Sequence, residues 1–175
     1  MMILVTGGSG SGKSAYAEDR VLSLGEGRRI YVATMHPYDG ESLRRVKRHR
    51  QMRAGKGIET VERYTNMREL ILPGDSVVLL ECMSNLVANE MFQGDKIREG
   101  IVMDVVNGIR DLKDQVRHLV IVTNEIFSEP ACYEGDTVRY QEYLGKVNQL
   151  LALLADEVVE VVYGIPVWHK GGNSK

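Results

Sequence analysis

The sequence predicts an α/β fold in which a doubly wound, mostly parallel sheet is flanked by helices. Two observations support this prediction. Apolar runs of strand length alternate with segments of helical periodicity along the chain, and a glycine-rich turn joins the first apolar run directly to a helix. Continuous apolar runs are typical of parallel strands that are buried on both faces.

Length and composition indicate one compact unit. The chain has 175 residues, of which 43% are hydrophobic and 26% are charged, and these are ordinary values for a globular protein. A chain of this length can bury a substantial core. We therefore expect a single domain over residues 1–167 and a frayed tail over residues 168–175.

The expected elements follow from apolar periodicity and from glycine and proline punctuation. Strands are expected at 2–5, 29–34, 58–62, 76–81, 118–123 and 157–163, and helices at 14–24, 41–52, 66–72, 83–92, 95–112 and 140–155. Ligands of open α/β sheets bind outside the carboxyl ends of the strands. Thr34 to Gly40 and Asn124-Glu125 should therefore border a ligand site, as should the loop at 128–136.

The turn after the first strand carries a phosphate-binding motif. Its residues are Gly7, Gly8, Ser9, Gly10, Ser11, Gly12, Lys13 and Ser14, which fit G-x-x-x-x-G-K-[ST]. In such loops backbone N–H groups surround phosphate oxygens, the lysine reaches the β- and γ-phosphates, and the hydroxyl can ligate Mg²⁺. The alternative is a flexible glycine-rich linker. The strand before the motif and the helix after it favour a nucleotide site.

A strongly basic segment follows the second expected strand. Seven Lys or Arg residues and His49, but no acidic residue, lie between Arg44 and Lys56. On a helix Arg45, His49 and Arg53 share one face. Neighbouring cations should lower the His49 pKa and keep the imidazole neutral and nucleophilic, and the arginines can hold phosphate oxygens. The alternative interpretation is a solvated basic surface.

Glu81 ends the apolar run from Ser76 to Leu80, as the acidic residue of a Walker-B strand does. A carboxylate at that end of a strand can hold Mg²⁺ directly or through water. Ser14 and Glu81 are therefore the expected metal-binding residues. The alternative is that Glu81 caps the helix that follows it.

Charge and cysteine content exclude several classes of protein. The net charge of −2 gives no general reason to expect nucleic acid as a partner. Cys82 and Cys132 lack the spacing of a zinc site or a disulfide framework. No window approaches the roughly 20 apolar residues of a membrane span, and no signal peptide is apparent. We expect a cytoplasmic protein.

Taken together, these motifs resemble the bifunctional adenosylcobinamide kinase / adenosylcobinamide-phosphate guanylyltransferase family of cobalamin biosynthesis. The resemblance spans nearly the whole chain. It is carried by Met1 to Gly8, Ser11 to Ser14 with Ala17-Glu18, Tyr31 to Thr34, Asp39, Glu41, Arg45 to Arg50 with Arg53, Thr60, Glu62, Leu79 to Cys82, Val122 to Glu125, Gly145 to Gln149 and Ala155 to Val158.

The resemblance implies two reactions on one RecA-like domain. ATP or GTP would phosphorylate adenosylcobinamide, and GTP would then donate GMP to adenosylcobinamide phosphate through a covalent GMP-histidine at His49. Implied nucleotide contacts, besides the phosphate loop, are Ala33, Thr34, Met35, Arg50, Gln51, Met52, Arg53, Glu62 and Glu81. Mg²⁺ would accompany the nucleotide, and the protein would be a homotrimer.

Three departures from the family pattern stand out. Ala54 replaces a proline, Ile58 replaces a tryptophan, and residues 127–136 lack a Gly-Ile-Val-Pro run.

Two other functions stay open. One is a small-molecule kinase whose basic helix only grips phosphate, and the other is a nucleotide-switched binding module that docks on RNA or an acidic partner.

Overall fold

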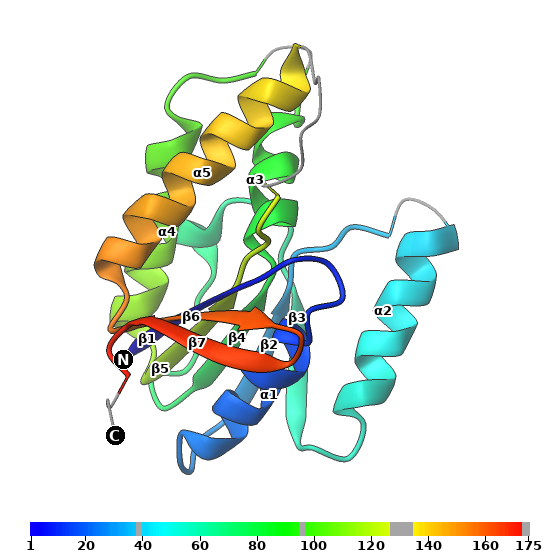
Figure 1. Cartoon of the computed structure of the whole chain (residues 1–175), viewed down its shortest axis with the longest axis vertical. Coiled ribbons are helices and arrows are strands. Elements are labelled where there is room, and N and C mark those ends of the chain that lie inside the picture. The colour runs from blue at the N-terminus through cyan, green and yellow to red at the C-terminus, as the bar shows by residue number, and fades with distance from the viewer. Residues whose placement is uncertain (38–39, 95–96, 127–134, 173–175) are drawn as a thin grey trace.

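A computed structural model describes residues 1–37, 40–94, 97–126 and 135–172. Its strands form one seven-stranded sheet in the order β3-β2-β4-β5-β1-β6-β7 (Figure 1). They are β1 (Met2–Thr6), β2 (Arg29–Ala33), β3 (Ile58–Glu62), β4 (Val77–Glu81), β5 (His118–Val122), β6 (Glu157–Val162) and β7 (Ile165–Lys170). Neighbouring strands are parallel except β6 and β7. The predicted mostly parallel, doubly wound sheet is confirmed.

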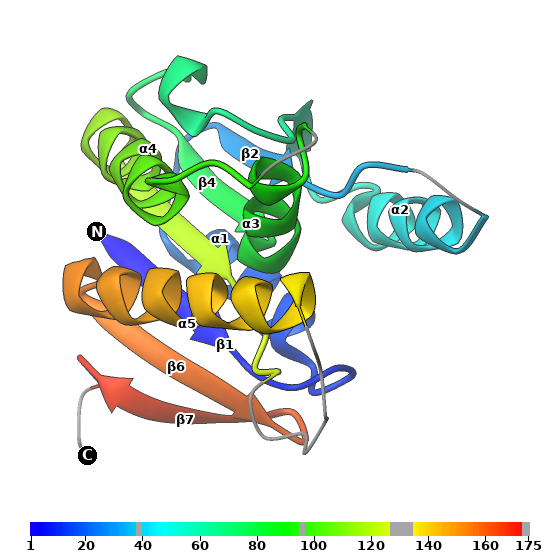
Figure 2. The same ribbon diagram turned by 90° about the horizontal axis from the view of Figure 1, so that it is seen from above.

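Helices cover both faces of the sheet (Figure 2). The helix α1 (Lys13–Ser23) lies on one face, and α3 (Met83–Met91), α4 (Ile101–Gln115) and α5 (Asp136–Leu154) lie on the other. The helix α2 (Gly40–Arg53) stands beside the β2–β3 edge.

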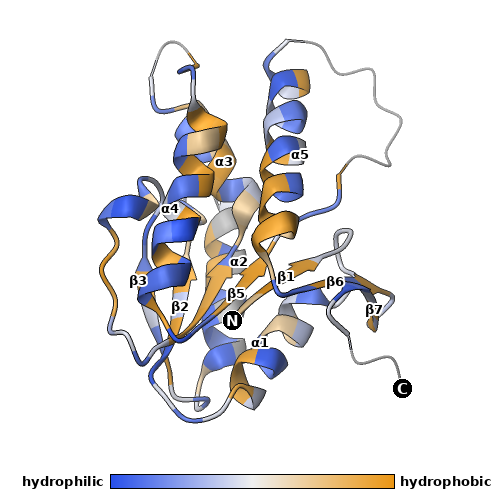
Figure 3. Cartoon of the chain, turned by 90° about the vertical axis from the view of Figure 1, so that its left-hand side faces the viewer, coloured by the Kyte–Doolittle hydropathy of each residue, from blue (hydrophilic) through white to orange (hydrophobic). Residues whose placement is uncertain are grey.

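The core has two parts because successive residues of each strand point to opposite faces. Ile3 and Val5 of β1 pack with Ala17 and Val21 of α1, whereas Leu4 packs in the cluster that includes α3, α4 and α5. Figure 3 shows the hydrophobic strands between helices whose outer faces are hydrophilic. This is why the strands read as unbroken apolar runs.

Two expected helices differ from the observed ones. The helix predicted at 95–112 is α4, which begins at Ile101 after Gly100 in a left-handed conformation, while residues 95–96 lie outside the described part of the chain. The helix predicted at 66–72 was wrong: only the 3-10 turn η1 (Met67–Glu69) forms there. Asn66 adopts φ 50, so the chain cannot enter an α-helix at that residue.

The prediction of a frayed tail from Trp168 was wrong over residues 168–170. These residues complete β7, which pairs antiparallel with β6. Tyr163 and Gly164 both have positive φ, as a tight hairpin turn requires. Pro166 lies within β7, and an edge strand tolerates proline. Residues 173–175 lie outside the described chain, and no helix among the described residues is long and apolar enough to cross a membrane.

Candidate active site

The phosphate loop lies between the carboxyl end of β1 and the start of α1, so the predicted residues Gly7 to Ser14 are brought together. Gly12 precedes α1 at φ 93, and Gly7 has φ 154 where an added Cβ would lie 2.6 Å from the Val161 carbonyl oxygen. Only glycine suits such a position. Segments that follow β5 and β6 hold the loop: Glu125 N donates to Gly7 O at 3.1 Å, and Gly164 N donates to Ser11 O at 2.8 Å.

Lys13 is a buried cation within this loop. Its side chain is 9% exposed, and Nζ donates to the Gly8 carbonyl oxygen at 2.9 Å. Burial lowers the pKa of Lys13, whereas Cys82 and Glu81 act in the opposite direction. A buried ammonium group of this kind interacts strongly with an anion because the surroundings screen it poorly.

Ser14 and Glu81 meet at the loop, as predicted for a hydroxyl and a carboxylate that share a metal ion. Ser14 Oγ donates to Glu81 Oε1 at 2.5 Å. The N-cap residue of helix α3 is Cys82 rather than Glu81. Both oxygens suit Mg²⁺. Among the described residues no group of three His, Cys, Asp or Glu could hold a metal.

A pocket adjoins the loop, between α2 and the carboxyl ends of β2, β3 and β4. It is lined by Tyr31, Ala33, Met35, Pro37, Leu43, Val46, Arg50, Arg53, Thr60, Glu62, Tyr64, Glu81, Cys82 and Asn85. Six predicted nucleotide contacts are among these residues: Ala33, Met35, Arg50, Arg53, Glu62 and Glu81. Glu81 borders both this pocket and Ser14, so the pocket and the phosphate loop form one continuous site.

Arg53 is the most unusual side chain of the pocket. It is only 5% exposed, and its guanidinium carbon lies 3.4 Å from the centroid of the Tyr31 ring. Its Nε and Nη1 are buried and have no hydrogen-bond partner within the described structure. Buried donors without partners are costly, so a ligand that accepts these bonds would be favoured.

Tyr31 connects Arg53 to the phosphate loop. Its hydroxyl donates to Glu81 Oε2 at 3.1 Å, while the other oxygen of Glu81 accepts from Ser14. Burial and the Glu81 charge raise the pKa of Tyr31, which keeps the hydroxyl protonated as a donor, although Arg53 acts in the opposite direction. The contacts Ser14–Glu81–Tyr31–Arg53 therefore run from the loop to the end of α2.

The rim of the pocket is polar. Arg50 Nη2 donates to Glu62 Oε1 at 2.8 Å, and the Tyr64 hydroxyl donates to the other carboxylate oxygen at 2.8 Å. Glu62 thereby joins α2 to the segment after β3. The rim presents both charges to solvent.

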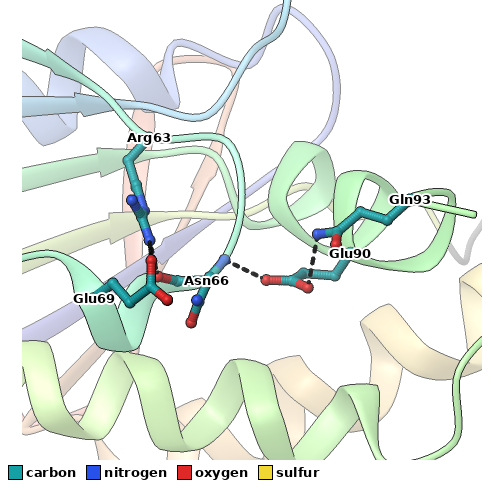
Figure 4. Close-up of polar contacts among 5 residues, drawn as sticks. All are labelled: Arg63, Asn66, Glu69, Glu90 and Gln93. Carbon is teal, nitrogen blue, oxygen red and sulfur yellow. Dashed lines mark hydrogen bonds and ion pairs between the residues drawn. The ribbon is translucent and has the colours of Figure 1, made fainter.

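The wall that carries Tyr64 is anchored to α3. Asn89 Nδ2 donates to Thr34 O at 2.8 Å and to Tyr64 O at 2.9 Å. Nearby, the buried Glu90 accepts from Asn66 N, and Arg63 holds Asn66 O (Figure 4). Two consecutive residues of one helix thus position the loop between β3 and η1.

Two predicted contacts lie elsewhere, and a third has a side chain that the structure does not describe. The Thr34 hydroxyl is buried and bonds the backbone of Cys82, donating to its oxygen at 2.8 Å and accepting from its nitrogen at 2.7 Å. Gln51 is exposed and borders a hollow with Lys47 and Ala54 rather than this pocket. The Met52 side chain lies outside the described part of the structure.

His49 is placed only by its backbone. It lies on α2, three residues after Val46 and four before Arg53, both of which line the pocket. Residues at these spacings are neighbours on a helix surface. The side chains of His49 and Arg45 are outside the described structure. Residues 127–134, which include most of the loop expected at 128–136 to border a ligand site, are outside it too.

The comparisons with known proteins decide the family. The family model for "cobinamide kinase / cobinamide phosphate guanyltransferase" matches residues 3–168. The chain belongs to this family. It is 36% identical to the bifunctional adenosylcobalamin biosynthesis protein CobU of Escherichia coli (strain K12), with 95% of this chain and 98% of that protein covered. The protein of the same name from Salmonella typhimurium is 33% identical over the same shares. The resemblance seen in the sequence is confirmed.

Solved structures share the fold of this cobinamide kinase / guanyltransferase family member. The flagellar accessory protein FlaH of Methanocaldococcus jannaschii matches with a TM-score of 0.58 at 13% identity, covering 99% of this chain and 81% of that one. A type III secretion system ATPase matches with a TM-score of 0.53 at 11% identity, covering 91% and 50%. Identities this low establish the P-loop α/β fold alone.

Sequence reasoning missed several residues that line the pocket of this family member, notably Tyr31, Tyr64 and Asn85. They come from three separate segments and carry no charge pattern. One signal was present: Leu43, Val46, Arg50 and Arg53 follow a helical period, which marks a face of α2 that is not wholly solvated.

Proposed function

We propose that this protein phosphorylates adenosylcobinamide with ATP or GTP and then transfers GMP from GTP to adenosylcobinamide phosphate. The products of the second reaction are adenosylcobinamide-GDP and pyrophosphate. One observation carries the proposal beyond family membership. The phosphate loop and a pocket lined by a buried arginine are joined through Glu81 in a single site.

In the kinase step the loop binds the triphosphate. Backbone N–H groups of Gly8 to Ser14 surround the phosphates, and Lys13 neutralises charge on the transferred group. Ser14 and Glu81 would hold Mg²⁺, which neutralises charge on the phosphate oxygens when it is bound. The acceptor hydroxyl forms a bond to the terminal phosphorus as the bond to the bridging oxygen breaks.

In the guanylyl step we propose His49 as the nucleophile. Its unprotonated imidazole nitrogen attacks the α-phosphorus of GTP, an N–P bond forms, and pyrophosphate leaves. The phosphate of adenosylcobinamide phosphate then attacks the same phosphorus, the N–P bond breaks and the imidazole is restored. Arg50 and Arg53 lie on the same helix, and cations there stabilise charge that gathers on the phosphoryl oxygens.

We further propose that the pocket holds the guanine nucleotide. The buried Nε and Nη1 of Arg53 have no partner among the described residues, so hydrogen-bond acceptors of a nucleotide bound there would be favoured. Ala33, Thr34 and Met35 would contribute backbone contacts, and residues 50–53 with Glu62 and Glu81 would complete the site. The proposed assembly is a homotrimer, which size-exclusion chromatography with light scattering would test.

The test is covalent labelling with GTP. After incubation with α-labelled GTP and Mg²⁺, the wild-type protein should carry acid-labile, base-stable label and gain the mass of GMP. His49→Ala should carry none, because no other imidazole is proposed to reach the α-phosphorus.

His36→Ala is the matched control. The centroid of the His36 ring lies 4.7 Å from that of Tyr64, which lines the same pocket. It should keep the label. An unlabelled wild-type protein, or label that persists in His49→Ala, would overturn the histidine mechanism. Kinase activity without any trapped GMP would instead indicate a small-molecule kinase.

A further inference from the structure

The helix α2 is held to the rest of the molecule near its C-terminal end. Figures 1 and 2 show it beside the sheet, apart from α3, α4 and α5. Described contacts at that end are the Arg53 guanidinium over Tyr31 and the Arg50–Glu62 ion pair. A third contact comes from Lys56, in the turn that follows. Lys56 N donates to Arg53 O at 3.1 Å, so the position of Lys56 fixes the last turn of the helix.

Lys56 is paired with a carboxylate of the phosphate-loop helix. Its Nζ lies 2.6 Å from Glu18 Oε2, and Glu18 is four residues after Ser14 on α1. Glu18 is fully buried, and its Oε1 has no hydrogen-bond partner among the described residues. A buried carboxylate requires a compensating cation, so this ion pair ties Lys56 firmly to α1.

The backbone around Lys56 is suited to pivoting. Gly55 and Gly57 flank it at φ 80 and φ 65, and nothing lies within 4 Å of a Cβ added to either glycine. Glycine is the residue that most easily changes φ and ψ. A helix attached through two such glycines needs another contact to define its direction, and the Lys56–Glu18 ion pair supplies one.

We infer that Glu18 and Lys56 are positioning residues for guanylyl transfer, and that their ion pair sets how α2 approaches the phosphate loop. The inference rests on the proposed function, because α2 carries His49. Chemistry at the α-phosphorus depends on that approach, and a displacement of about 1 Å can lower the rate of a reaction about 100-fold. Transfer of the terminal phosphate uses Lys13, Ser14 and Glu81, which lie outside α2.

The test separates the two reactions in one preparation of each variant. Lys56→Gln should lower kcat for GMP transfer by about 10- to 100-fold, while kcat and KM for phosphorylation of adenosylcobinamide change less than about twofold. Lys56→Arg, which restores the charge, should recover most of the GMP transfer. Glu18→Gln should behave like Lys56→Gln if it folds, and the lysine variants keep the test valid if it does not.

Glu157→Gln is the matched control. It breaks the 2.8 Å Arg20–Glu157 ion pair, which joins the same helix α1 to β6 without touching α2. In this variant the ratio of kcat for GMP transfer to kcat for phosphorylation should stay the same as in the wild type. If Lys56→Gln lowers both reactions by the same factor, the ion pair is merely structural and the inference is wrong.

A second measurement does not depend on activity. Backbone hydrogen exchange in residues 40–57 should become faster in Lys56→Gln than in the wild type and stay unchanged in Glu157→Gln. Unchanged exchange in Lys56→Gln would overturn the inference. A wild-type protein that transfers no GMP would instead refute the proposed function, and hydrogen exchange would still decide whether the ion pair restrains α2.

Discussion

At the scale of single residues, the site depends on charged side chains that are buried together. Lys13 and Arg53 are both largely buried, and Glu81 lies between them, bonded to Ser14 on one side and Tyr31 on the other. Water would otherwise screen these charges and weaken their interaction with phosphate. The cost is that each charge is desolvated when the chain folds.

Lys13→Met tests how much the buried Lys13 contributes to phosphorylation. The variant should lose about 100-fold or more in kcat/KM for phosphorylation, because the cation that faces the phosphates is gone. Steady-state kinetics with adenosylcobinamide measures the loss. Ala15→Ser, an exposed change on the same helix, should be nearly neutral. A loss below about tenfold would mean that Lys13 does not stabilise the transition state.

The lowered pKa of Lys13 should also make the stability of the wild-type protein depend on pH, and Lys13→Met is the reference. Burial lowers the pKa of Lys13 below its usual 10.5, so between the folded pKa and 10.5 the unfolded chain binds more protons than the folded one. Stability therefore rises with pH in that window. The melting temperature of the wild type relative to Lys13→Met should increase on the alkaline side toward pH 10.5. A constant or falling difference would contradict the assigned effect of burial.

At the scale of elements, α3 shapes the pocket without contributing a charged group to it. Asn89 binds the backbone carbonyls of Thr34 and Tyr64, which belong to the segments after β2 and β3. These segments have no regular helix or strand structure. One amide side chain therefore holds two parts of the pocket wall in register.

Asn89→Leu should raise KM for GTP several-fold and destabilise the fold by about 1–3 kcal/mol, because two carbonyl groups lose their donor. Steady-state kinetics and urea unfolding measure the two effects. Gln93→Leu is the control: Gln93 lies just after the end of α3, and the change removes its hydrogen bond to Glu90 without affecting the bonds to Thr34 or Tyr64. Equal KM values in the two variants would show that Asn89 does not shape the nucleotide pocket.

At the scale of the whole molecule, the last strand supports the first loop. The β6–β7 turn places Gly164 N against Ser11 O, and Lys170 Nζ donates to the Ala152 and Leu153 carbonyl oxygens at the end of α5. The C-terminal hairpin thus joins the phosphate loop, the sheet edge and α5. A tail frayed from residue 168 would lack the two hydrogen bonds of Lys170.

Two truncations distinguish a strand from a frayed tail. Ending the chain after Gly172 should leave the melting temperature unchanged. Ending it after Val167 should lower it by about 3–10 °C, because pairing of Trp168 and Lys170 with β6 and the bonds of Lys170 are lost. Differential scanning calorimetry makes the comparison. Equal melting temperatures would mean that residues 168–170 add nothing to stability.

Much of the fold could be predicted because parallel strands buried on both faces leave a plain signal. The strand at 58–62 was located to the residue. The order of strands could not be predicted, since pairing of β1 with β5 and β6 depends on contacts between distant segments. The start of α4 was predicted too early because apolar periodicity extends back to Ile97. The left-handed conformation of Gly100 prevents the helix from beginning before Ile101.

The candidate site also has residues that could be predicted from the sequence and residues that could not. Gly7 to Ser14 could be identified as a phosphate-loop motif because the motif consists of adjacent residues whose consecutive backbone amides suit phosphate oxygens. Glu81 was found from its place at a strand end. Tyr31 and Asn89 could not be found, because their roles arise from partners 50 residues away at Glu81 and 55 residues away at Thr34.

By itself, the sequence determined the α/β class, the phosphate loop, the basic helix and the family, because each depends on residue types at short spacings. Tertiary structure alone decided that Glu81 joins the loop to the pocket, that Arg53 is buried against Tyr31, and that Lys56 reaches Glu18. The physical reason is that burial and pairing are properties of surfaces brought together by folding, and a side chain's neighbours along the chain do not reveal them.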